Sequence, residues 1–220
     1  MQPDIQNQYI QDNCKSIVNY MLSKLKAYSP ETYNHSIDVA KYSLIIGKQA
    51  GLSQEELTKL YTASTLHDVG KLVIDQDLLA EKFTSREQKR IIQLGHIYGT
   101  KMLLEGKIDD DIFNIAYHHH ERLNGTGYPQ GLQADDLSDM DRILQVADVT
   151  SALTMKRSYK DAYDKELTNQ ILDDTVQKGE LDPRYVTIAE KEIVDKTDTL
   201  DSDKNGNDRE NTMSETIAYM

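Results

Sequence analysis

Apolar residues recur every three to four positions along nearly the whole chain up to about Lys191, which is the spacing of an amphipathic helix. No stretch alternates between apolar and polar residues over the length of a β-strand. The pattern therefore predicts an all-α fold. The connections between the apolar stretches are short, which is typical of a compact helical bundle.

Capping residues place three helix starts. Ser29-Pro30 combines a serine cap with proline at the first helical position, and predicts a helix that continues to Gly51. The segments 53–56 and 84–87 both have the spacing of a capping box and precede helical patterns. The histidines on these three predicted helices are His35, His67 and His96.

Two further helices are expected in the second half of the chain. One begins near Asp110 and is expected to carry the three consecutive histidines 118–120. The other follows Ser138 and carries Asp148. Between them, the segment NGTGYP at 124–129 is dense in turn-forming residues and must be a loop.

The two ends of the chain show no candidate chemistry. Residues 1–27 hold an apolar pattern and are interpreted as an N-terminal helical segment that packs on the body or on a second subunit. The main domain is expected over 28–192. Residues 193–220 are polar and acidic, and are interpreted as a disordered tail.

Composition narrows the functional classes. With 38% hydrophobic residues and no long apolar run, the chain is expected to be globular without a membrane span, and the absence of a signal-peptide pattern favours the cytoplasm. The lone Cys14 excludes an internal disulfide and paired cysteine ligands. A formal net charge of −12 argues against binding a nucleic-acid polymer, although bound cations would still permit a small anionic substrate.

The segment LHDVGK at 66–71 is the first sign of chemistry. Imidazole and carboxylate on adjacent residues suit divalent metals, and the two oxygens of Asp68 make it the natural bridge between two ions. If the helix continues past His67, Lys71 lies one turn further on and can reach a phosphate oxygen. An HD pair alone is a weak signal, however, and a salt bridge at a helix end would also explain Lys71.

The ordered series of metal-ligand types carries more weight. The motifs HDVGK, HHERLNGTGYP and VADVTSAL occur in that order, and the region 28–184 that contains them resembles the HD-GYP branch of the HD phosphohydrolase superfamily. The resemblance implies an HD-domain helical bundle with a GYP loop near a metal site. The implied metal ligands are His35, His67, Asp68, His96, His119, His120 and Asp148, with Glu31 as an eighth.

Two of these assignments keep an alternative. Glu31 lies four residues before His35, and a glutamate there accompanies three-metal sites in the resembling family. An acidic residue in the first helical turn is also favoured by the helix dipole alone. His118 is the histidine left over, and is expected to face elsewhere or to support a ligand; the alternative is a register in which it replaces one of its neighbours as a ligand.

The resemblance also implies an activity. Two or three divalent ions, iron or manganese because the ligands include no thiolate, would hold a bridging hydroxide that attacks a phosphodiester, with Asp68 and Lys71 in catalytic roles. Lys71, Tyr128, Arg157 and Lys160 would contact the substrate, although the last two could be ordinary solvated surface. The family substrate is cyclic di-GMP, cleaved to pGpG and in some members to GMP. Related members accept cyclic GMP-AMP.

Two residues depart from the family pattern and keep other functions open. Asn124 and Ser151 stand where the family usually has aspartate. Asn124-Gly125 can still make a left-handed turn, whereas the charge missing at Ser151 is expected to have touched a ligand, Lys71 or the substrate. The alternatives are another HD nucleotide phosphohydrolase, an iron oxygenase on the same scaffold, which Lys71 and the GYP loop disfavour, and a catalytically weak signalling module. No regulatory domain fits in the chain, so regulation is expected from a partner protein or a homodimer.

Overall fold

The computed structural model describes residues 3–76, 78, 86–155 and 162–196. Within these ranges the chain is helical and contains no β-strand, which confirms the predicted all-α fold. The α-helices are α1 (Pro3–Tyr28), α2 (Pro30–Gln49), α3 (Gln54–Leu66), α5 (Arg86–Leu104), α6 (Asp110–Tyr117), α7 (Asp139–Thr154), α8 (Lys165–Gln177) and α9 (Pro183–Glu192). The 3-10 helices are η1 (Val69–Val73), η2 (Ala134–Asp136) and η3 (Val194–Lys196).

The capping residues act as the sequence predicts. The Ser29 side chain accepts a hydrogen bond from the Thr32 amide at the start of α2, and Pro30 occupies the first turn. Ser53 opens α3 with a complete capping box, and Ser138 opens α7 in the same way. The capping box predicted at 84–87 lies outside the residues whose side chains are described.

Two helices end earlier than the sequence pattern indicates. α3 ends at Leu66, so the chain passes through His67 and Asp68 into η1, and the expected helical turn from His67 to Lys71 does not form. α6 ends at Tyr117, so the histidines 118–120 lie in a turn and not on a helix. The prediction that a helix carries the histidines 118–120 was therefore wrong, and the condition set for Lys71, a helix that continues past His67, is not met. At each of these helix ends a histidine ring bonds a carbonyl group of the last helical turn.

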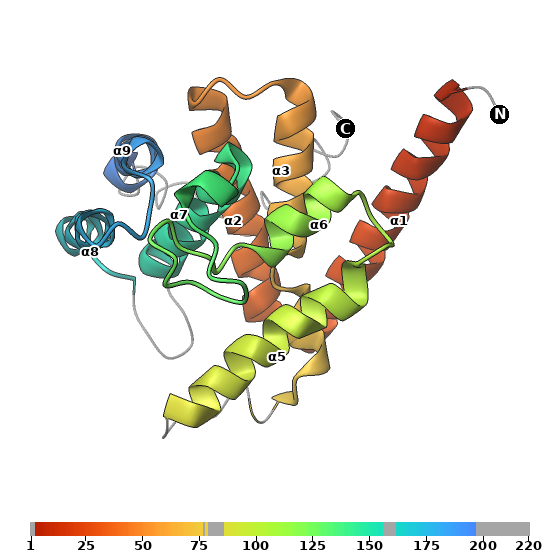
Figure 1. Cartoon of the computed structure of the whole chain (residues 1–220), viewed down its shortest axis with the longest axis horizontal. Coiled ribbons are helices and arrows are strands. Elements are labelled where there is room, and N and C mark those ends of the chain that lie inside the picture. Colours follow the sequence, from red (N-terminus) through yellow and green to blue (C-terminus); the bar gives the residue numbers. More distant parts are fainter. Residues whose placement is uncertain (1–2, 77, 79–85, 156–161, 197–220) are drawn as a thin grey trace.

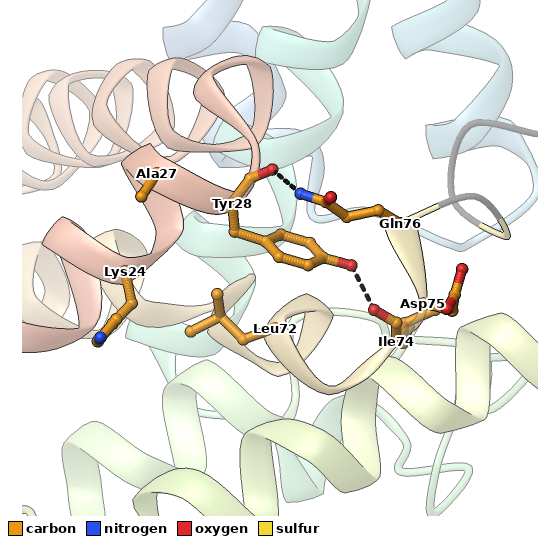
Figure 2. Close-up of a pocket in the computed structure, with 7 residues that line it drawn as sticks. All are labelled: Lys24, Ala27, Tyr28, Leu72, Ile74, Asp75 and Gln76. Carbon is orange, nitrogen blue, oxygen red and sulfur yellow. Dashed lines mark hydrogen bonds between the residues drawn. The ribbon is translucent and has the colours of Figure 1, made fainter.

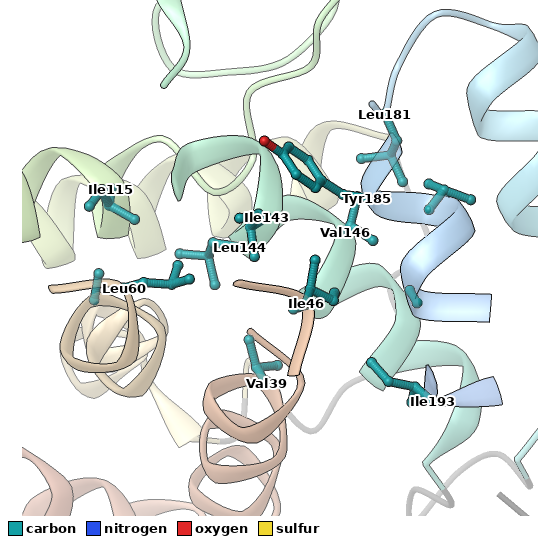
Figure 3. Close-up of a cluster of buried hydrophobic side chains, with 14 of the residues drawn as sticks. Val39, Ile46, Leu60, Ile115, Ile143, Leu144, Val146, Leu181, Tyr185 and Ile193 are labelled. Atoms are coloured by element: carbon teal, nitrogen blue, oxygen red, sulfur yellow. The ribbon is translucent and has the colours of Figure 1, made fainter. Parts of the chain in front are cut away.

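α2, α3, α6 and α7 form the centre of the molecule, with α8 and α9 on one side and α1 and α5 on the other (Figure 1). Figure 3 shows the main hydrophobic core, in which Ile46 of α2, Leu60 of α3 and Leu144 of α7 are fully buried. A second cluster around Leu66 and Ile97 packs beneath η1 and α5. These two clusters fix the positions of the helices and turns that carry the candidate ligands.

The N-terminal helix α1 packs against α2, α3 and η1, with Met21, Leu22 and Leu25 buried. At its end the Tyr28 hydroxyl donates a hydrogen bond to the Ile74 carbonyl, and the side-chain amide of Gln76 donates to the Tyr28 carbonyl at 2.5 Å (Figure 2). These residues line a hollow of about 650 Å³ between α1 and the segment after η1. α1 is therefore tied to the chain that leads out of the HD turn.

The predicted boundaries of 1–27, 28–192 and 193–220 remain predictions. Ile193 and Val194 are almost completely buried, so core packing extends two residues past 192. Residues 197–220, which the sequence predicts to be a disordered tail, lie outside the described part of the chain. Among the helices that the structure describes, none combines the length and the apolar character needed to cross a membrane.

Candidate metal centre

Histidines and aspartates from five separate segments meet in the interior. His35 comes from α2, His96 from α5 and Asp148 from α7, while the pairs 67–68 and 119–120 come from the turns after α3 and α6. In the described residues, two compact groups have ligand atoms within 4.8 Å of one another. The first group is His35, His67 and Asp68, and the second is His96, His119 and His120.

The first group is rich in carboxylate. His35 Nε2 lies 3.0 Å from Asp148 Oδ1 and 4.0 Å from Asp68 Oδ2. His67 Nε2 lies 3.6 Å from Asp68 Oδ2 and 3.9 Å from Asp148 Oδ1. Two imidazoles and two carboxylates therefore face the same small volume, a donor set that suits divalent iron, manganese or zinc.

The second group consists of imidazoles and adjoins the first through two contacts. The ring centroids of His96 and His119 are 5.2 Å apart, and those of His119 and His67 are 4.8 Å apart. Asp68 supplies the other contact, because its Oδ1 lies 3.1 Å from His96 Nε2 while its Oδ2 faces the first group. The carboxylate of Asp68 thus stands between the two groups, with one oxygen toward each.

Ring nitrogens without partners show that this site fits metal ions. His67 Nδ1 lies 2.6 Å from the Ser64 carbonyl, and His119 Nδ1 lies 2.6 Å from the Ala116 carbonyl. A carbonyl can only accept, so each Nδ1 carries the proton and each Nε2 carries the lone pair. Both Nε2 atoms are buried without a hydrogen-bond partner. A buried imidazole nitrogen of this kind, held by a hydrogen bond at the opposite nitrogen, is arranged as a metal ligand usually is.

The two carboxylates remain ionised despite their burial. Burial raises the pKa of Asp68, but the positive charge of the neighbouring Lys71 opposes this effect, and the net pKa lies well below its ordinary value. Burial acts in the same way on Asp148, and the hydrogen bond with His35 again brings the net pKa well below the ordinary value. Ionised carboxylates are the form that binds cations.

Three of the candidate histidine ligands are kept in their neutral form. Burial lowers the pKa of His35 and of His119, and lowers the pKa of His120 to about 3. These rings are therefore neutral near pH 7, as a metal ligand must be. The electrostatics of the pocket match a site for divalent cations.

Lys71 lies beside the metal-ligand cluster. Although the helix does not continue to it, η1 brings its Nζ to 2.6 Å from Asp68 Oδ2. The side chain is partly exposed, so the ammonium group lies between the buried carboxylate and solvent. An ammonium with three protons can keep this contact and still donate to a phosphate oxygen.

The GYP loop covers the second group. The Tyr128 ring lies 4.8 Å from the His120 ring at an angle of 35°, and the Tyr128 amide donates to the His120 carbonyl at 3.2 Å. Gly127 is required here, because a Cβ atom would lie 2.4 Å from the backbone of Glu121. Burial raises the pKa of Tyr128, so its hydroxyl stays protonated.

Glu121 has a role that the sequence interpretation missed. Its side chain is fully buried, and its two oxygens accept from the Gln130 amide at 2.6 Å and the Leu132 amide at 3.0 Å. The carboxylate thereby fastens the far end of the GYP loop to the turn that carries the histidines. The motif HHE places this glutamate next to two candidate ligands, but its partners on the loop cannot be derived from the sequence.

Other predicted residues fall outside these two groups. Glu31 is half-buried in the first turn of α2, and neither compact group includes it. His118 faces Asp141, with 3.2 Å between its Nδ1 and the carboxylate, in agreement with its expected position away from the ligands. Arg157 and Lys160 lie outside the described residues.

Asn124 and Ser151, the two residues that depart from the family pattern, form hydrogen bonds in different parts of the structure. Asn124 donates from its side-chain amide to the Lys178 carbonyl at 2.8 Å and accepts from the Thr126 amide, so it stabilises the loop. Ser151 Oγ lies 3.0 Å from His35 Nδ1, so the residue does contact a candidate ligand, as expected.

The chain is similar in sequence to known proteins. A family model described as an HD domain matches residues 14–185. The chain is 34% identical to the 3′3′-cGAMP-specific phosphodiesterase 2 of Vibrio cholerae over 81% of this chain and 35% of that protein. It is 36% identical to the cyclic di-GMP phosphodiesterase response regulator RpfG of Xanthomonas campestris over 64% of this chain and 38% of that protein. The chain thus spans little more than a third of these relatives.

A solved structure shares the fold. The HD domain of the phosphodiesterase PgpH from L. monocytogenes aligns with a TM-score of 0.62 and 18% identity over 82% of this chain and 98% of that chain. The same domain has been solved in complex with cyclic-di-AMP, where the TM-score to this chain is 0.62 with 17% identity and coverage of 84% and 98%. At these identities the likeness shows the fold alone.

Proposed function

This chain belongs to the HD domain family and is of the HD-GYP type, and on that premise we propose that it is a metal-dependent phosphodiesterase that hydrolyses a cyclic dinucleotide. The observation that carries the proposal is the pair of adjoining ligand groups, which Asp68 links, with unpartnered Nε2 atoms at His67 and His119. Relatives named as phosphodiesterases of 3′3′-cGAMP and of cyclic di-GMP support the substrate class.

The proposed ligands are those of the sequence analysis. His35, His67 and Asp148 would hold one divalent ion, and the second group another, with Asp68 between them. Glu31 would serve a third ion. Iron and manganese are preferred because every donor is nitrogen or oxygen. Bound there, such ions would supply Lewis acidity toward the phosphate and an activated water.

The side chains around the ions have their own tasks. Asp68, kept ionised by Lys71, fixes the spacing of the two ligand groups. Lys71 would donate a hydrogen bond to a non-bridging phosphate oxygen and stabilise the charge that develops there. Tyr128, stacked on His120, would present its ring to a base of the substrate. Arg157 and Lys160 remain proposed contacts for the second phosphate.

The proposed substrate is cyclic di-GMP, cleaved to pGpG and possibly onward to GMP, and 3′3′-cGAMP is the second candidate because relatives in Vibrio cholerae carry that name. Another nucleotide phosphohydrolase and a catalytically weak signalling module are the competing functions. The module is favoured by one specific observation, namely that a neutral Ser151, and not a carboxylate, supports His35.

The deciding experiment uses protein purified without oxygen. Metal per chain is measured, and cyclic di-GMP, 3′3′-cGAMP, pGpG and simple nucleotides are then incubated with the protein and manganese or ferrous iron. Two or three metals per chain with release of pGpG or GMP support the proposal. Full metal loading and binding of cyclic di-GMP without turnover would establish the signalling module instead. Turnover of mononucleotides alone would establish the other phosphohydrolase.

A further inference from the structure

Ser151 differs from the backbone carbonyl groups that hold His67 and His119, because its partner group is a hydroxyl. The residue is fully buried on α7, one turn after Asp148. Its Oγ lies 3.0 Å from His35 Nδ1 and 3.2 Å from the sulfur of Met155. A hydroxyl has one proton to donate and two lone pairs that accept, so Ser151 can serve these two neighbours in two different ways.

The sulfur of Met155 decides which arrangements are available. A thioether has no proton and is a weak acceptor, so Ser151 must donate in that contact. When it does, a serine lone pair is left to accept from an N–H at His35 Nδ1. When the hydroxyl proton turns toward His35, the Nδ1 atom must instead carry a lone pair.

The protonation of Nε2, the other ring nitrogen of His35, determines which of the two hydrogen-bond arrangements forms. Nε2 lies 3.0 Å from Asp148 Oδ1, an acceptor that favours a proton on Nε2 while no cation is bound. A cation that binds Nε2 needs the lone pair there, so the proton must then be on Nδ1. The ring stays neutral in this change, because one proton leaves Nε2 to solvent and one is taken up at Nδ1.

We propose that Ser151 and Met155 form a reversible hydrogen-bond pair that lets His35 change its tautomer when a divalent cation binds at Nε2. Without the cation, Ser151 donates to Nδ1. With the cation, Nδ1 donates to Ser151, whose proton turns to the sulfur of Met155. Ser151 is thus a positioning residue of this centre, and the inference rests on the metal binding that the proposed function requires.

Two other candidate histidine ligands, His67 and His119, cannot change their tautomers in this way. His67 and His119 donate from Nδ1 to backbone carbonyls at 2.6 Å, and a carbonyl can only accept. Their tautomers are therefore the same with and without a cation. An aspartate in place of Ser151, which the resembling family usually has, would likewise accept only and would keep a proton on Nδ1 at all times.

Histidine nitrogen NMR tests the proposal directly. Protein with ¹⁵N-labelled histidine is recorded metal-free and saturated with Zn²⁺, which is diamagnetic. The proton of His35 is expected on Nε2 without Zn²⁺ and on Nδ1 with it, while His67 keeps its proton on Nδ1 in both states. In Ser151→Asp, Nδ1 of His35 should be protonated in both states. An unchanged His35 tautomer in the native protein overturns the proposal.

Zn²⁺ affinity gives a second readout. Ser151→Ala should weaken binding by roughly 10- to 100-fold, the usual cost of losing a partner behind a ligand, and Met155→Leu by a smaller factor. The matched control is Ser43→Ala, which removes another buried serine hydrogen bond, at 2.9 Å to Ser64, on the helix that carries His35. Its affinity should equal that of the native protein.

The possible failures can be distinguished. Native affinity in both Ser151→Ala and Met155→Leu would overturn the proposal even if Zn²⁺ binds. A Zn²⁺-loaded protein with the expected tautomer change and no turnover of any cyclic dinucleotide would overturn only the proposed function. Absence of Zn²⁺ binding would overturn both. If Ser151→Ala does not fold, the native spectra and Met155→Leu decide the question.

Discussion

The two ligand groups of the metal centre differ in charge. The group of His35 and His67 faces two carboxylates, whereas the group of His96, His119 and His120 consists of imidazoles alone. Asp68 gives one oxygen to each side, so the second group depends on a negative charge from outside it. We infer that Asp68 joins the two groups, so loss of Asp68 should affect both groups, whereas loss of a histidine from one group should affect mainly that group.

Replacement of Asp68 should have the largest effect. Asp68→Asn removes the negative charge that both groups share, so metal content should fall at both. Hydrolysis should drop by about 10³-fold or more, because the metal ions are lost. Each tenfold loss of rate corresponds to about 1.4 kcal/mol of transition-state stabilisation. Metal analysis and initial rates measure the two effects. Asp75→Asn, an exposed residue at the hollow beside α1, is the control. Full metal loading in Asp68→Asn would show that the two groups do not share this carboxylate.

Replacement of one histidine in either ligand group should distinguish the metal bound by that group from the metal bound by the other. His35→Gln and His120→Gln should each remove about one metal and lower the rate by about 10²-fold, because the other group and Asp68 remain. The metal that stays bound is identified by titration of each variant with manganese. Loss of both metals in either variant would mean that the groups fill together and not one by one.

The pH dependence of stability should be strong in the metal-free protein. The pKa of His120 is about 3 when folded and near 6.5 when unfolded, so the unfolded chain binds more protons between these values. Stability is then fully present above pH 6.5 and falls with decreasing pH, by roughly 2 kcal/mol at pH 5 from this group alone. Urea unfolding at several pH values measures this change in the free energy of unfolding. An equal pH dependence in His120→Gln would contradict the assignment.

The attachment of the GYP loop gives the smallest expected effect. Glu121→Gln replaces one of two carboxylate oxygens that accept backbone amides and should destabilise the fold by about 1–2 kcal/mol. Because the loop carries Tyr128, KM should rise as well, while metal content stays the same. Urea unfolding and steady-state kinetics measure these changes. Glu105→Gln on the surface serves as the control, and an equal response in both variants would exclude an anchoring role.

The sequence predicts the elements better than their ends. Caps at Ser29, Ser53 and Ser138 act locally, within one turn, so the starts of α2, α3 and α7 could be placed from neighbouring residues alone. At the ends of α3 and α6 the rings of His67 and His119 bond helix carbonyls, contacts that apolar spacing does not reveal.

The same distinction applies to the site. The resemblance carried by the ordered motifs named the candidate ligands, and the structure brings six of them into two compact groups. The roles of Glu121 and Ser151 could not be derived in this way. Their partners at Gln130, Leu132 and His35 are brought to them only when loops and helices pack, which is a property of the tertiary structure.

Anomalous X-ray diffraction from crystals grown without oxygen in the presence of manganese tests the central claim most directly. The structure predicts at least two manganese peaks, one bound by His35 and His67 and one by His96 and His119, with the carboxylate of Asp68 between them. A single peak, or peaks that leave Asp68 uncoordinated, would contradict the two-site centre on which the proposed hydrolysis depends.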